Sequence, residues 1–175
     1  MPERSAHHAA VPVPLDYDDA DAIPWLREGA VAGAFGALVV AAFFFALDLA
    51  AGHPLATPNR LGAAFFQGRT VAAAAPIQPI LVLAYTVMHL AVFVALGFTA
   101  AFTGLSVAPE RRGAHRALLR WGFLVLLSEV IFLSFGRLFA MDLLGQLGAG
   151  RVAVANVLAA GAMAAFIERR ARAAL

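Results

Sequence analysis

Residues 29–51 read GAVAGAFGALVVAAFFFALDLAA, and no charged residue occurs between Glu28 and Asp48. Roughly 20 apolar residues are enough for a helix to cross the hydrocarbon core of a bilayer. The stretch therefore predicts a transmembrane helix over 29–51. The composition agrees, since 62% of the 175 residues are hydrophobic and 14% are charged, whereas about a quarter of the residues in soluble domains are charged.

Three further segments have the same character. No Asp, Glu or Arg occurs between Arg69 and Glu110, and Pro76 and Pro79 lie where a helix can begin, which predicts a second helix over 80–104. A third is expected over 118–139, interrupted by Glu129, and an alanine-rich fourth over 147–168. The sequence thus predicts an all-α, polytopic membrane protein with four transmembrane helices in a compact bundle.

The connection over 52–79 contains the signals of one more short helix. Thr57 is a residue type that caps helices, Pro58 follows it, and Gly68 can end the helix. Leu61, Phe65 and Phe66 are expected to face one way, so we predict a helix lying on the membrane surface. The alternative is a lid over a site between the long helices.

The arginine distribution predicts the orientation, because positive charges flanking spans stay in the cytoplasm. With four spans, an acidic, Pro-containing tail over 1–28, the 105–117 connection and a basic end over 169–175 share one side. That side carries Arg4, Arg27, Arg111, Arg112, Arg116, Arg120, Arg169, Arg170 and Arg172, and the other carries Arg60, Arg69, Arg137 and Arg151. Both termini are expected inside, with the loop 52–79 facing outward.

Small residues predict close helix packing. Gly29, Gly33 and Gly36 on the first helix form a face that lets two backbones approach each other. A similar face is expected on the fourth helix, formed by Gly148, Gly161, Ala153, Ala160 and Ala164. These faces are typical of a compact bundle.

Polar residues inside the spans are the candidates for function, because polar groups at this depth are costly and usually face protein or water. His89, Glu129 and Asn156 each lie roughly 15 Å from the outer end of their helices, at about 1.5 Å per residue. We therefore predict a central cluster of these three, with Tyr85 and Thr86 beside it. Asp48 and Arg137 lie nearer the outer surface, where they could pair.

Several roles for this cluster are open. A His and a carboxylate can relay protons, the group could hydrogen-bond a quinone or a lipid headgroup, or it could be a structural network that fixes helix register. One His, one carboxylate and one amide make a thin metal shell, so no metal is expected, and the sequence leaves any cofactor unknown. Phosphate-loop, HExxH and GxSxG motifs are absent from the sequence, which argues against an enzyme.

Two stretches carry a resemblance to a known family. The segment DLAAGHPLATPNRLG at 48–62, followed by YTVMH at 85–89, resembles a family of small, uncharacterised bacterial membrane proteins with four predicted helices. The resemblance covers the N-terminal half. It implies that Asp48, Pro54, Thr57 and His89 belong to one outward-facing unit, and it implies no catalytic role.

The functional expectation follows from these features. All 13 basic residues are arginine, as a GC-rich bacterial genome produces, and they separate apolar runs rather than forming a patch for nucleic acid. We expect a non-enzymatic protein of the bacterial inner membrane: an accessory or structural subunit of a larger, energy-transducing membrane complex, or a homo-oligomer. Its partners would be the lipid bilayer and other membrane subunits or itself. The alternative is a small transporter or proton-linked carrier using His89 and Glu129.

Overall fold

The computed structural model describes residues 24–106, 114–138, 145 and 147–173. Its helices are α1 (Pro24–Ala50), α2 (Ala56–Gln67), α3 (Pro79–Ser106), α4 (Ala114–Leu138) and α6 (Ala149–Ala173). Residues 1–23 of the predicted acidic tail lie outside the described residues. So do Arg111 and Arg112, on which part of the orientation argument depends.

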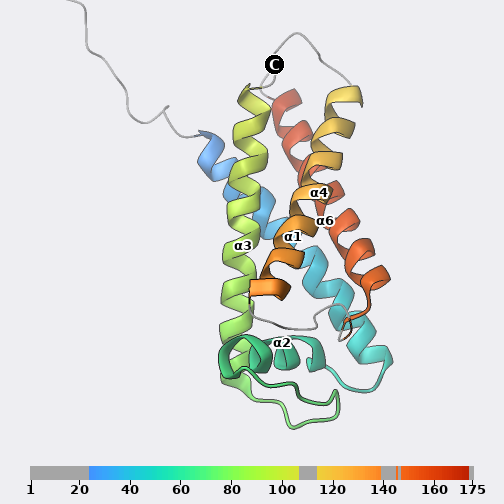
Figure 1. The fold of residues 1–175 in the computed structure, drawn as a ribbon. Coiled ribbons are helices and arrows are strands. Elements are labelled where there is room, and N and C mark those ends of the chain that lie inside the picture. Colours follow the sequence, from blue (N-terminus) through green and yellow to red (C-terminus); the bar gives the residue numbers. More distant parts are fainter. Residues whose placement is uncertain (1–23, 107–113, 139–144, 146, 174–175) are drawn as a thin grey trace, which may run out of the picture.

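Four of these helices are long and apolar enough to cross a membrane, over Trp25–Ala50, Pro79–Phe102, Ala117–Ser134 and Ala149–Arg170. They pack side by side and run alternately up and down, with α2 lying across one end (Figure 1). Both ends of the described chain lie at the opposite end of the bundle. The predicted all-α, multi-pass membrane bundle is therefore confirmed.

The helix ends differ from the predicted ones in ways that side chains explain. α1 begins at Pro24 rather than at residue 29, since proline suits the first helical position and the Trp25 ring packs against Phe98 and Phe102 of α3. Residues 24–28 therefore belong to α1 and not to the tail. α4 begins at 114 instead of 118, and α6 runs from 149, after the left-handed Gly148, to 173 rather than 168.

Glycine brings α1 and α3 into backbone contact. A Cβ atom on Gly97 would lie 2.6 Å from the backbone nitrogen of Gly33, and one on Gly33 would lie 2.6 Å from the Cα of Val94. Real Cβ atoms do not approach other atoms so closely. The predicted small-residue face of the first helix is confirmed, and its partner is α3.

The predicted face on the fourth helix is only partly correct. Ala160 and Ala164 are buried, but Ala153 is exposed, and a Cβ on Gly161 would first meet the Trp121 ring at 3.8 Å. The buried side of α6 instead includes Ala155 and Ala159. Because α6 is rich in small apolar residues all round, its sequence does not specify which side faces the core.

Candidate functional site

The helix α2 is held in place by the last turns of α1. The backbone N–H of Thr57 donates to Oδ2 of Asp48 at 2.7 Å, and the Thr57 hydroxyl donates to Oδ1 at 2.8 Å. The residue before the helix is Leu55, in the left-handed region at φ 66°, and its side chain makes no cap hydrogen bond. The predicted capping role of Thr57 is therefore wrong, because Asp48 supplies the acceptor from another helix.

This contact also replaces the expected partner of Asp48. The Asp48 carboxylate is buried against Thr57, whereas Arg137 is exposed near the end of α4. Both oxygens of Asp48 accept hydrogen bonds from Thr57, which lies only nine residues along the chain. The expected Asp48–Arg137 pair is not formed between these residues.

Replacing Asp48 with alanine is expected to free α2 from the bundle. The Thr57 N–H and hydroxyl would lose their acceptors, and a buried donor without a partner costs about 1–3 kcal/mol. Trypsin should then cut after Arg60 and Arg69 several times faster than in the parent protein, with a lower unfolding temperature. Leu49→Ala, at an exposed neighbouring position, is the control; equal cleavage rates for the two variants would contradict the cap.

Two contacts hold α2 against the start of α3 and the loop before it. A Cβ on Gly62 would lie 2.5 Å from the carbonyl oxygen of Leu81, so glycine is required there. Asn59, 1% exposed, accepts the Gln78 N–H at 2.9 Å and donates to the Pro76 carbonyl at 3.3 Å. The role of Asn59 was not predicted, because its hydrogen-bond partners lie in a loop whose path the sequence does not reveal.

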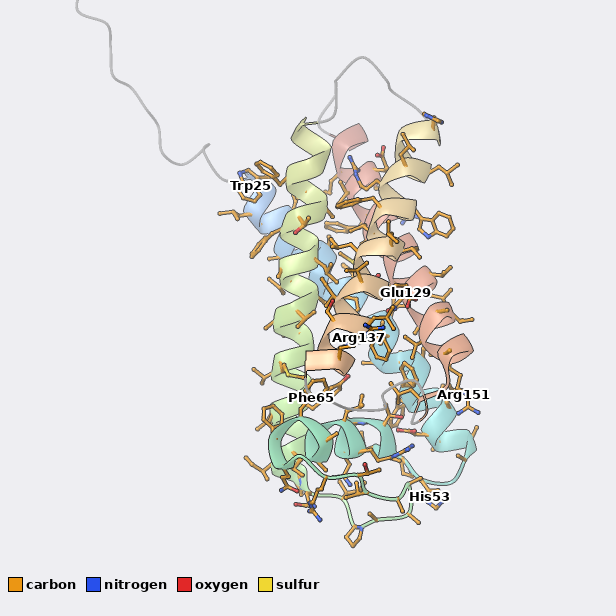
Figure 2. The ribbon with its side chains drawn as sticks, in the orientation of Figure 1. Trp25, His53, Phe65, Glu129, Arg137 and Arg151 are labelled. Carbon is orange, nitrogen blue, oxygen red and sulfur yellow. The ribbon has the colours of Figure 1, made fainter. Side chains whose placement is uncertain are left out.

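The side chains of α2 differ from the prediction that Leu61, Phe65 and Phe66 face one way. Leu61 is buried and Phe65 is half-buried, and both line a cavity inside the bundle, while Phe66 is 51% exposed. Figure 2 shows Phe65 where α2 meets the long helices. The helix therefore covers one end of the bundle, and one of its sides forms part of the cavity wall.

The cavity has a volume of about 120 Å³ and lies between α1, α3, α4 and α6, with α2 at its end. Its wall consists mostly of aliphatic and aromatic side chains, and its polar members are Tyr85, His89, Ser128 and Asn156. For comparison, an apolar cavity of about 150 Å³ can hold benzene. The space therefore suits one small ring or a short apolar segment.

Four rings follow one another along the cavity wall. Phe65 stacks on Tyr85 with centroids 6.2 Å apart, Tyr85 stacks on His89 at 5.8 Å, and His89 meets Phe93 at 4.8 Å. The last three occur at four-residue spacing, which places them on one face of α3. We call Phe65, Tyr85, His89 and Phe93 the aromatic ladder.

His89 carries the unpaired polar atom of this wall. Its Nε2 is buried and, within the described part of the chain, has no hydrogen-bond partner. A buried imidazole nitrogen without a partner is costly in free energy, and it can donate or accept according to the tautomer. The atom is therefore suited to hydrogen-bond a molecule in the cavity.

Glu129 and Asn156 form the second polar feature. The Asn156 amide donates to Oε1 of Glu129 at 3.0 Å, joining α4 to α6. The predicted common depth brings these two together, and Asn156 lines the cavity with His89. Among the described residues, Glu129 is hydrogen-bonded to Asn156 and not to His89, so the expected direct pair of His89 and Glu129 is not formed.

Tyr85 and Thr86 were both expected beside the cluster, but only Tyr85 lines the cavity. Tyr85 belongs to the aromatic ladder, whereas Thr86 is exposed and its hydroxyl donates to the Val82 carbonyl of its own helix. Ser128 is buried in the cavity wall, where its hydroxyl donates to the Leu124 carbonyl at 2.6 Å. The polar wall therefore comes from α3, α4 and α6.

An ion pair at the other end of α4 and α6 was not predicted. Arg120 lies 2.9 Å from Glu168, and the two side chains are 7% and 11% exposed. The position of this pair follows from the antiparallel arrangement of α4 and α6. Because Glu129 is hydrogen-bonded to Asn156, a residue nine positions earlier in α4 lies near the C-terminal end of α6. Arg120 was expected only to be one of the positive charges that set the orientation.

Within the ranges that the structure describes, no group of three or more His, Asp or Glu side chains is placed to hold a metal ion. Comparisons of the chain with protein-family models, with curated proteins and with solved structures find no match. The function is therefore inferred from the cavity and the side chains in its wall.

Proposed function

We propose that this is a non-enzymatic protein of the bacterial inner membrane that binds one small lipid-soluble molecule in the bundle cavity. The observation that carries the proposal is the buried Nε2 of His89, which lacks a partner beside an apolar space with Asn156 in its wall. Apolar cavities with a few placed polar groups are typical of small-molecule sites.

The aromatic ladder defines the ligand class. Flat rings stack on aromatic side chains, and a ring carbonyl can accept a hydrogen bond from an imidazole or an amide. A quinone-type ring has both features, and a membrane supplies such molecules from its interior. Closure of the cavity by α2 favours entry from the lipid between helices.

We propose that such a protein works as an accessory subunit of a larger, energy-transducing membrane complex or as a homo-oligomer. Large apolar side chains on the outside of the bundle support this, including Leu38, Ile80, Leu126 and Leu158, since they suit either lipid or another membrane subunit. The arginine distribution favours both termini in the cytoplasm, and the described ends of the chain lie together.

The alternative function is a small transporter or proton-linked carrier. Asn156 favours it, because this residue is hydrogen-bonded to Glu129 and lines the cavity with His89. In proteoliposomes, a carrier would move protons or solute and would stop on Glu129→Gln. Our proposal predicts no such flux from the purified chain.

Replacing His89 with phenylalanine separates a binding role from a structural one. Phenylalanine keeps the stacking with Tyr85 and Phe93 and removes the unpaired nitrogen, so the unfolding temperature is expected to stay equal or to rise. Equilibrium dialysis with 1,4-benzoquinone, a single ring, as the probe should show about tenfold weaker binding, as expected when a hydrogen bond is lost. A lowered unfolding temperature with unchanged benzoquinone binding would show that His89 serves the fold alone.

A further inference from the structure

A second cavity, of about 130 Å³, lies where the end of α1, the helix α2 and the start of α6 meet. Its wall differs in kind from that of the central cavity, because it contains Asp48, His53, Arg60 and Arg151. Figure 2 shows His53 and Arg151 at the end of the bundle that α2 closes. We call this space the outer cavity.

The two arginine side chains of the outer cavity have no ion-pair partner within the described part of the chain. Nε of Arg60 is in addition buried and has no hydrogen-bond partner among the described residues. Arg151 also lies in the first turn of α6, where the helix dipole adds positive potential. A buried guanidinium nitrogen without an acceptor calls for an anionic group beside it.

The charges in the wall indicate the kind of anion. Arg60 and Arg151 contribute two positive charges, and Asp48 contributes one negative charge whose two oxygens accept from Thr57. Together, the charges of Arg60, Arg151 and Asp48 give a net charge of about +1. Guanidinium groups bind phosphate oxygens in a planar, two-pronged geometry, and a phosphodiester carries a single negative charge.

We propose that the outer cavity binds a phosphate group through Arg60 and Arg151. The site lies at the ends of the spans, since the first ends at Ala50 and the fourth begins at Ala149, and this is the level of lipid headgroups. Phe44 and Leu147 line both cavities, so an apolar tail attached to the phosphate meets an adjoining apolar surface. A phospholipid supplies the same chemistry as free phosphate and adds this contact.

The test is isothermal titration of the full chain in a nonionic detergent with two probes, inorganic phosphate and short-chain dihexanoyl-phosphatidylglycerol. Arg60→Gln and Arg151→Gln should each weaken binding about tenfold or more, as expected when a charged hydrogen bond is lost. Arg69→Gln is the matched control, because this arginine lies outside the cavity and contacts Gln67. Tighter binding of the lipid identifies a headgroup site, and equal binding of both probes identifies a phosphate-ion site.

The proposal is overturned if neither probe binds, or if the Arg60 and Arg151 variants bind as the parent does. Arg151 is exposed, so Arg151→Gln tests the site even where Arg60→Gln fails to fold. Neither Arg60 nor Arg151 lines the central cavity, so benzoquinone binding should be unchanged in Arg151→Gln.

Discussion

Gly33→Leu is expected to abolish the packing of α1 on α3 and with it the stable bundle. Even a Cβ at this position would lie 2.6 Å from the Cα of Val94, and leucine adds three more carbon atoms. Overpacking of a core typically costs 1–3 kcal/mol, and here the obstacle is backbone that cannot move aside, so we expect a cost of at least about 3 kcal/mol.

The matched control is Gly122→Leu. Gly122 lies in a spanning helix as well, but a Cβ there meets no atom within 4 Å. Size-exclusion chromatography of the detergent-solubilised protein after heating should show early aggregation of Gly33→Leu and parent-like behaviour of Gly122→Leu. If both variants aggregate at the same temperature, the α1–α3 contact is not what the structure describes.

Arg120→Met is expected to cause a loss of similar size at the other end of the bundle. The substitution removes the guanidinium group that lies 2.9 Å from the buried Glu168 carboxylate, and breaking a buried pair in this way costs about 3–5 kcal/mol. The side chains are 7% and 11% exposed, so water cannot replace the lost contact. The unfolding temperature in detergent should fall sharply.

A double variant distinguishes the loss of the interaction between Arg120 and Glu168 from the loss of the Arg120 side chain itself. Replacing both Arg120 and Glu168 with methionine removes both charges, and exchanging a whole buried pair for apolar residues is often neutral. The double variant should therefore unfold at a temperature near that of the parent and well above Arg120→Met. Additive losses in the two single variants and the double variant would show that the two charges do not interact.

The spans were predictable because a bilayer imposes one strong requirement, a long apolar helix. The stretch over 29–51 meets it by composition alone, and so does the one over 80–104. Common depth was predictable for the same reason, which is why Glu129 and Asn156 were expected to meet and do so. Depth depends only on counting residues from the ends of the spans.

The rotation of each helix was harder to predict. Ala153 was expected on the packed face of α6 and is exposed, because a helix apolar on every side has no stripe that marks the core. Arg120 and Glu168 were missed for the same reason. Which charged side chains turn inward depends on the rotation and register of the helices, and the apolar composition of a span specifies neither.

The loop around α2 depended on side-chain partners that spacing does not reveal. Thr57 has the residue type of a cap, yet it donates to Asp48. Asn59 has the residue type of an exposed loop and is buried against the backbone of residues 76–78. These contacts hold α2 at the end of the bundle, where Leu61 and Phe65 line the central cavity and Arg60 lines the outer one.

Solvent extraction of the protein after gentle native purification, followed by mass spectrometry, tests the binding site most directly. The proposal predicts about one lipid-soluble molecule per chain. Its recovery should fall strongly in Ala155→Leu, which narrows the cavity, and should be unchanged in Ala153→Leu, which faces outward on the same helix. Equal recovery from both variants, or no bound molecule in the parent protein, would contradict the proposed function.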